Sequence, residues 1–254
     1  MNIHQEILAK SEQNGRICLY QHLKNVADIA RVVANHQCLD EEIAVEGALL
    51  HDIGKTSPLF QQSIASPDSK KPGAVFRHEI ASLFFISLVK AEHRNAVIDM
   101  VVAHHKSMYK DVRELGILDL DDNMDNCFRA HSRGFEEWSH IALEILESLG
   151  METHEVSLGE AEDNYKYVID YCENRSRGCS EWRGLLMAAD HMASAMETEF
   201  EMPLDKLFIK PDLSFYDRRN ELYPLSMISA ENSSKHTLVT APTGAGKTDF
   251  LLRR

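Results

Sequence analysis

Several histidines and one aspartate stand on the apolar stripes of predicted helices, where apolar side chains are usual. They are His22, His51, His78, His104, His105 and Asp190, and a second aspartate, Asp52, directly follows His51. A buried carboxylate or charged imidazole without a partner costs several kcal/mol. Each histidine alone would favour a hydrogen-bonded core residue, but one metal centre would supply partners to the whole set. We therefore interpret the set as a metal site.

The adjacent pair His51 and Asp52 favours two ions rather than one. Neighbouring side chains on a straight helix point about 100° apart, so the pair cannot face one ion but can flank two. If Asp52 bridges two ions, His51 can bind one, and His104 and His105 can approach the other. Ions about 3.5–4 Å apart would clamp a phosphate and activate water. The mixture of imidazole and carboxylate favours iron, manganese, nickel, cobalt or zinc over calcium.

Lys55 stands one turn beyond His51, where its charge could touch a substrate phosphate or the charge that develops in the transition state. An ordinary surface lysine is the alternative. The other histidines lack the inward placement of the set, and we interpret them as structural: His4, His36, His93, His131, His140, His154, His191 and His236. Of these, only His191 could support the site, because it adjoins Asp190.

Composition limits the kind of partner. The 254 residues contain 27 Lys and Arg against 40 Asp and Glu, which gives a formal charge of −13. This balance argues against a generally basic nucleic-acid surface, so a phosphate must be met locally, by metal or by a few placed cations. The five cysteines form no CxxC pair, and we find no secretion signal and no apolar run long enough to span a membrane. We expect reduced thiols and a cytoplasmic protein.

The sequence predicts that helices position these residues. Apolar periodicity and capping residues predict helices over 19–34, 40–52, 78–89, 95–106, 136–149, 161–174 and 180–199, with a short helix opening at Ser57-Pro58. We expect an exposed loop over 66–73. The segment 107–134 has little periodicity and contains the run LDLDDNMDN, which predicts a solvated loop or, less favoured, a metal-binding loop. The fold class is therefore all-α.

The character of the chain changes after Pro203. An irregular stretch leads to the β-like run 237–240 and a glycine-rich turn. We predict two domains, residues 1–202 and residues 203–254.

The order of the motifs is specific. HLKNVA, HDIGK, FRHEIAS, VVAHHKS and LLMAADHMAS together resemble the HD nuclease of type I CRISPR-associated nuclease-helicases over residues 15–200. The resemblance implies an HD-domain helical bundle with two divalent transition metal ions. It assigns one ion to His22, His51, Asp52 and Asp190, and the other to Asp52, His78, His104 and His105. It also implies a catalytic role for Asp52, an assisting role for Lys55 and a DNA contact for Ser194.

The C-terminal TLVTAPTGAGKT resembles motif I of superfamily 2 helicases, although Ala241 stands where the general pattern has glycine. Backbone amides of such a loop cradle phosphates. The residues expected to bind nucleotide are Gly244, Gly246, Lys247 and Thr248. No further helicase motif follows, so we expect a truncated helicase segment without ATPase activity, and Mg-ATP only in the full-length helicase.

The leading hypothesis is metal-dependent hydrolysis of single-stranded DNA in type I CRISPR interference, as an endonuclease or exonuclease. The partners that the resemblance implies are single-stranded DNA, the RNA-guided surveillance complex and anti-CRISPR proteins, with no membrane. Two alternatives stay open. The HD scaffold could act on nucleotides or cyclic nucleotides, or the domain could be a non-catalytic docking module.

Overall fold

The computed structural model describes residues 6–65, 76–102, 104–105, 117–119, 124–175, 180–198, 204, 208, 225, 239–247 and 250. The chain divides into two compact units, Met1–Leu204 and Asp205–Arg254. The assignment of the second unit to a helicase stays a prediction.

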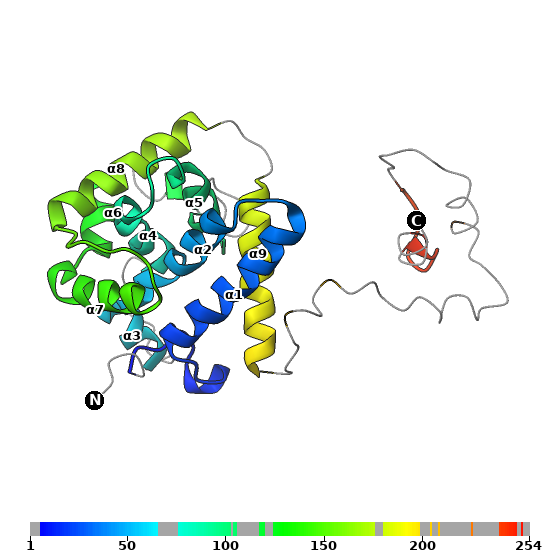
Figure 1. The fold of residues 1–254 in the computed structure, drawn as a ribbon, viewed down its shortest axis with the longest axis horizontal. Coiled ribbons are helices and arrows are strands. Elements are labelled where there is room, and N and C mark those ends of the chain that lie inside the picture. Colours follow the sequence, from blue (N-terminus) through cyan, green and yellow to red (C-terminus); the bar gives the residue numbers. More distant parts are fainter. Residues whose placement is uncertain are drawn as a thin grey trace. The chain divides into compact units, whose positions relative to one another are not determined.

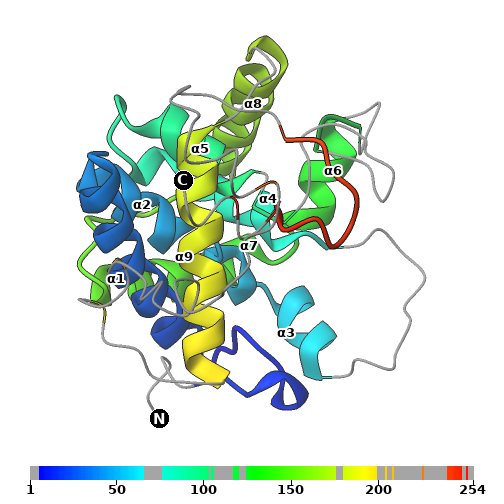
Figure 2. The same cartoon turned by 90° about the vertical axis from the view of Figure 1, so that its right-hand side faces the viewer.

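The first unit is a bundle of helices (Figure 1 and Figure 2). α1 (Leu19–Gln37) packs against α2 (Glu41–Leu50) and α9 (Glu181–Thr198), and α5 (Arg94–Val101) contacts both α2 and α9. These helices come from distant parts of the sequence and enclose a common interior. Apart from an isolated bridge between Leu8 and Cys18, the regular elements of the described residues are helices, which confirms the all-α fold class.

The first two helices follow their sequence signals closely. The predicted apolar positions of α1 are buried, Leu23 and Val26 among them. Asp40 caps α2, since its carboxylate accepts hydrogen bonds from the N–H groups of Glu42 and Ile43 at 2.8 and 3.3 Å. α3 (Pro58–Ala65) begins at proline, as the first-position rule predicts.

Three predicted helices end or change earlier than expected. α2 stops at Leu50 rather than residue 52, and a 3₁₀ helix, η3 (Ile53–Thr56), follows. The predicted helix 78–89 is a short α4 (His78–Ser82) that continues as the 3₁₀ helix η4 (Leu83–Leu88). α5 ends at Val101, before the two histidines predicted to lie on it. The four residues of η3 and the first four of η4 are buried, and an apolar run predicts burial without specifying the hydrogen-bond pattern.

The second half of the unit closes the core. α7 (Phe135–Ser148) and α8 (Leu158–Asn174) match the predicted helices. The ring of Phe135 packs between Phe85, to which it is tilted, and Trp138, which it meets edge-to-face, with ring centroids 5.5 and 5.0 Å away. This cluster fixes η4, and with it the chain that leads from α4.

One loop prediction is wrong in part. The segment 107–134 was expected to be irregular, but α6 (Met124–His131) forms within it. Its buried side chains, Cys127, Phe128 and His131, make a face only one turn long, which is too short for a periodicity signal. Residues 120–123, where the alternative metal-binding loop would centre, and the predicted loop 66–73 lie outside the described residues.

The second unit is described around its glycine-rich turn. Gly244 and Gly246 both have a φ of 83°, which favours glycine. The Nζ of Lys247 donates to the carbonyls of Ala241 and Pro242 at 2.9 and 2.8 Å. Of the predicted strand, residues 239 and 240 are described and form no strand, and Thr248 lies outside the described residues. Nucleotide binding here stays a prediction. Within the described part of the chain, none of the helices has the length and apolar character that crossing a membrane requires.

Candidate metal centre

His51 and Asp52 lie in the turn between α2 and η3. The N–H of His51 still donates to the carbonyl of Gly47 at 3.0 Å, but Asp52 leaves helical geometry, with φ −113° and ψ 4°. The helical divergence of about 100° between neighbours therefore does not apply here. His51 Nε2 lies 3.4 Å from Asp52 Oδ2, so both side chains face one interior space.

Gly54 lets η3 lie directly against α4. A Cβ on Gly54 would stand 2.2 Å from the carbonyl oxygen of His78 and 2.7 Å from the nitrogen of Ser82, so no side chain fits. The N–H of Gly54 also donates to Ser82 Oγ at 2.9 Å. This close approach places His78 Nε2 3.0 Å from Asp52 Oδ1.

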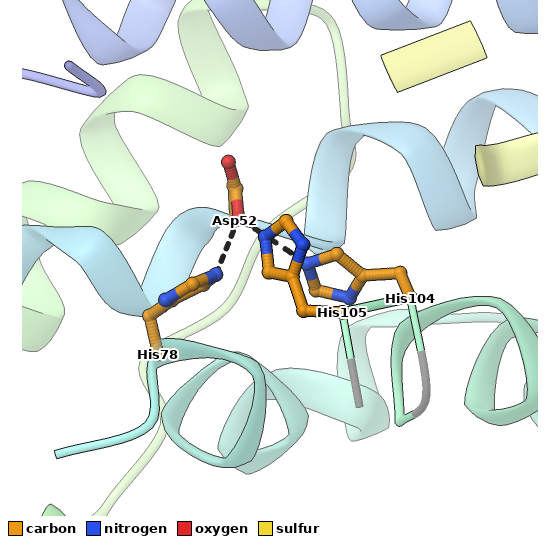
Figure 3. A group of neighbouring side chains, drawn as sticks. All are labelled: Asp52, His78, His104 and His105. Atoms are coloured by element: carbon orange, nitrogen blue, oxygen red, sulfur yellow. Dashed lines mark ion pairs between the residues drawn. The ribbon is translucent and has the colours of Figure 1, made fainter. Parts of the chain in front are cut away.

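Three imidazoles surround one side of Asp52 (Figure 3). His104 Nε2 lies 3.6 Å from Asp52 Oδ1, and the ring of His105 lies 4.1 Å from that of His104 and 5.1 Å from that of His78, centroid to centroid. One ligand atom from each of these four residues lies within 4.8 Å of the others. Imidazole and carboxylate in this number suit a divalent transition metal.

A second group shares Asp52 from the opposite oxygen. His22 Nε2 lies 3.2 Å from Asp52 Oδ2, and the ligand atoms of His22, His51 and Asp52 lie within 4.8 Å of one another. Asp190, from α9, adds a carboxylate whose Oδ1 lies 3.4 Å from His22 Nε2. The structure thus brings the other six predicted residues together near Asp52, with Asp190 reaching the second group through His22. Their roles as ligands stay a prediction.

The backbone holds two of the imidazoles from one side, and their other nitrogens face Asp52 without a hydrogen bond of normal geometry. His51 Nδ1 and His104 Nδ1 lie 2.7 Å from the carbonyls of Ala48 and Val101, respectively. A carbonyl only accepts, so each Nδ1 carries the hydrogen and each Nε2 presents a lone pair to the interior. The buried atoms that make no hydrogen bond of normal geometry within the described residues include four of this site: His51 Nε2, His78 Nε2, His104 Nε2 and Asp52 Oδ1. These are the atoms that metal ions would bind, so the donor set fits the expected cofactor.

The electrostatics of the site also favour the binding of a cation. Burial by itself would raise the pKa of Asp52, but its electrostatic interactions with His51, Lys55 and His78 lower it well below its usual value. Lys55 is only 8% exposed, and its Nζ donates to Asp52 Oδ2 at 2.5 Å. Asp52 is therefore a carboxylate at neutral pH, and it already attracts a cation.

The histidines of the site differ in their protonation, also within one group. Burial would lower the pKa of His104, but its hydrogen bond to Asp52 and the charge of Asp52 raise it. Burial lowers the pKa of His78, and burial together with the charge of His104 lowers that of His105 to about 3. Both are neutral at pH 7, as metal ligands must be. Burial would also lower the pKa of His22, but hydrogen bonds to Asp190, Asp52 and Glu197 raise it to about 10. A metal ion at His22 must therefore displace a proton.

The positions of the other predicted residues do not decide their roles. The ammonium of Lys55 contacts Asp52, and Ser194 lies half-buried one turn after Asp190, so their roles toward substrate stay predictions. His191 is exposed and faces away from the interior.

Two histidines interpreted as structural are buried, contrary to the expectation that they lack inward placement. His93 Nδ1 lies 2.6 Å from Glu46 Oε2. His131 Nε2 accepts the N–H of Arg77 at 3.0 Å and so anchors the residue before His78. The apolar periodicity of the sequence does not indicate the burial of these two histidines, because the buried faces of their helices are short.

Two further residues next to the site were not predicted. Glu197 lies seven residues after Asp190 on α9, and its Oε1 lies 3.3 Å from His22 Nδ1. The ring of Phe60 lies 5.4 Å from that of His78 and 5.5 Å from Lys55 Nζ. The signal for Glu197 is its i+7 spacing from Asp190 on the same helical face.

Comparison with known proteins agrees with this geometry. The HD domain family model matches residues 19–127, a range that holds His22, His51, Asp52, His78, His104 and His105. The match places an HD domain at residues 19–127. The chain is 33% identical over 118 residues to Ribonuclease Y of Chlorobium phaeobacteroides, which is 46% of this chain but 19% of that protein. The chain thus spans about a fifth of the relative's length, and no solved structure matches it.

The HD domain establishes a coarse function. HD domains are metal-dependent phosphohydrolases, and here the histidines and Asp52 are placed to bind metal. The match ends before Asp190 and Glu197, so the contribution of α9 rests on the distances alone.

Proposed function

We propose that this chain is a metal-dependent nuclease that hydrolyses phosphodiester bonds of single-stranded DNA. The observation that carries the proposal is Asp52, whose two oxygens face two different groups of imidazoles. A shared carboxylate suits two cations about 3.5–4 Å apart, the spacing found in two-metal phosphoesterases. When bound, two ions such as iron, manganese, nickel, cobalt or zinc would supply Lewis-acid activation of water and phosphate.

The residues around this centre can position a polynucleotide. The ammonium of Lys55 is held by Asp52, and neutralisation of that carboxylate by cations would free it to meet a phosphate oxygen. The ring of Phe60 stands beside Lys55 and His78, and aromatic rings of this kind stack bases without regard to sequence. Ser194 would contact the strand from α9.

The wider assignment is a role in type I CRISPR interference. It is supported by the order of the histidine and aspartate motifs and by the glycine-rich GAGKT turn further along the chain. In that role a helicase driven by Mg-ATP would feed the strand to the site. An RNA-guided surveillance complex would recruit the chain, and anti-CRISPR proteins would inhibit it.

A second candidate substrate is RNA, because the chain is similar to a protein named Ribonuclease Y. A nucleotide or cyclic-nucleotide phosphohydrolase is the alternative within the HD scaffold, and a docking module is the non-enzymatic one. The shared carboxylate with unpaired nitrogens around it favours an enzyme over a docking module.

The test offers purified chain four substrates with added Mn²⁺ or Ni²⁺: circular single-stranded DNA, single-stranded RNA, a mononucleotide and a cyclic nucleotide. We expect cleavage of the circular DNA, which requires endonuclease attack, and loss of cleavage in chelator. Preference for RNA would move the proposal to a ribonuclease. Preference for the nucleotides would contradict the nuclease assignment, and no hydrolysis with either metal would favour docking.

A further inference from the structure

Glu197 stands behind His22, on the side away from Asp52. Its two carboxylate oxygens lie 3.3 and 3.4 Å from His22 Nδ1. The other ring nitrogen, Nε2, faces Asp52 and Asp190 at 3.2 and 3.4 Å. Because the side chain of Glu197 is only 3% exposed, this contact is shielded from water. The imidazole is therefore held between the candidate metal ligands and a separate carboxylate.

Two side chains hold Glu197 in place. Lys10 Nζ donates to Glu197 Oε2 at 2.9 Å, and Asn25 Nδ2 donates to Oε1 at 2.9 Å. Lys10 belongs to a segment that is itself tied to the bundle, since Gln61 exchanges hydrogen bonds with the backbone of Leu8 at 3.1 and 2.9 Å. A charged, anchored carboxylate of this kind can orient a neighbouring ring. It also compensates the cost of its own burial through Lys10.

His22 differs from the other imidazoles in how its far nitrogen is held. His51 and His104 donate from Nδ1 to backbone carbonyls, which no substitution removes. His22 faces a side chain instead, so its support can be tested by mutation.

We propose that Glu197 is a positioning residue for the metal centre. It accepts the Nδ1 hydrogen of His22, which fixes the ring and leaves Nε2 to bind a divalent cation. The inference rests on the proposed role of His22 as a metal ligand. Groups that accept the far hydrogen of a ligating histidine orient it and raise its basicity, and their loss lowers metal affinity about 10–100-fold.

The experiment is a calorimetric titration of Mn²⁺ into the chelator-treated, dialysed full chain. We expect Glu197→Ala to weaken one class of Mn²⁺ site about 10–100-fold and to leave the other within about threefold. A cavity of about 260 Å³ between α1 and α9 adjoins Glu197, so water that enters it would keep the loss toward the lower value. Glu197→Gln should retain most of the affinity, because its amide oxygen still accepts the hydrogen of His22.

The control is Glu46→Ala, which removes a largely buried carboxylate, with a side chain 14% exposed, from a histidine that lies away from the centre, His93. It should leave both Mn²⁺ affinities unchanged. Thermal unfolding without metal tests whether each variant folds. If Glu197→Ala does not fold, Glu197→Asp keeps the charge and withdraws the carboxylate by one methylene, and it should weaken the same site.

The outcomes separate the two claims. Equal Mn²⁺ affinity in the wild type and the folded Glu197 variants would overturn the role of Glu197 while leaving the metal site intact. Glu197→Gln as weak as Glu197→Ala would overturn it too, since charge rather than ring orientation would then be responsible. A wild type that takes up no Mn²⁺ would overturn the proposed metal centre itself, and the inference with it.

Discussion

Asp52→Asn should have two separable effects, one on stability and one on catalysis. In the metal-free protein the substitution removes the charge that faces Lys55, which is 8% exposed and donates to Asp52 at 2.5 Å. Breaking a buried ion pair by removing one partner costs about 3–5 kcal/mol, because the remaining charge stays buried. This is a large share of a total stability of about 5–15 kcal/mol. We therefore expect a folded but much weakened variant.

The second substitution separates stability from catalysis. Lys55→Met in the Asp52→Asn background removes the stranded ammonium, so it should restore most of the lost stability. It cannot restore the oxygen that faces both imidazole groups. A loss of about 4 kcal/mol of metal-dependent transition-state stabilisation slows cleavage about a thousandfold. The double variant should therefore be stable and inactive.

Urea unfolding in chelator measures the first effect, and cleavage of circular single-stranded DNA with Mn²⁺ measures the second. The single variants and the double variant form a complete cycle with the wild type. A double variant that cleaves within about tenfold of the wild type would refute the two-ion assignment of Asp52. If Asp52→Asn alone were as stable as the wild type in chelator, the ion-pair reasoning would be wrong.

Three further predictions follow from the same site. Gly54→Ala should destabilise the protein and weaken Mn²⁺ binding, because its Cβ would lie 2.2 Å from the carbonyl oxygen of His78. The control variant is Gly184→Ala, whose Cβ would have no atom within 4 Å and which should stabilise the protein by about 0.5–1 kcal/mol. Equal urea midpoints for the two variants would contradict this prediction. The pKa of His22 rises from 6.5 to about 10 on folding, so the metal-free native state binds more protons than the unfolded state in that window. The unfolding free energy of the metal-free protein should fall as pH rises from 6.5 to about 10, and His22→Asn should reduce this dependence on pH. An unfolding free energy of the wild type that does not change over this range would contradict the raised pKa of His22. Mn²⁺ uptake at pH 8 should release about one proton, from His22. Calorimetry in two buffers of different ionisation heat measures this release. A release of zero protons would argue against His22 as a ligand.

The residues of the centre could be found from the sequence because burial leaves a pattern. A polar residue such as His22 or Asp190 on an apolar stripe is visible without any structure, and the structure brings both to Asp52. Residue preferences at helix ends predicted the cap at Asp40 and the start of α3 at Pro58. In each case the signal is local, since it depends on residues within one or two turns.

What could not be predicted depends on contacts between distant segments. The turn that aims His51 and Asp52 together follows from the approach of η3 to α4, which only a glycine at position 54 permits. Glu197 stands on a helical face shared with Asp190, but its meaning depends on Lys10, 187 residues earlier in the chain. Hydrophobic periodicity records which face is buried and carries no information about which side chains meet there.

The strongest physical argument for bound metal is the free-energy cost of burying these polar atoms in the metal-free protein. The Nε2 atoms of His51, His78 and His104 are buried and make no hydrogen bond of normal geometry within the described residues, although each lies within 3.6 Å of an oxygen of Asp52. A buried polar atom left without a hydrogen bond costs about 1–3 kcal/mol. A fold that only needed a packed interior would have apolar side chains at these positions. Cations that bind the unpaired atoms convert this cost into binding free energy, so the features that make the metal-free centre unfavourable are those that would make it selective for metal.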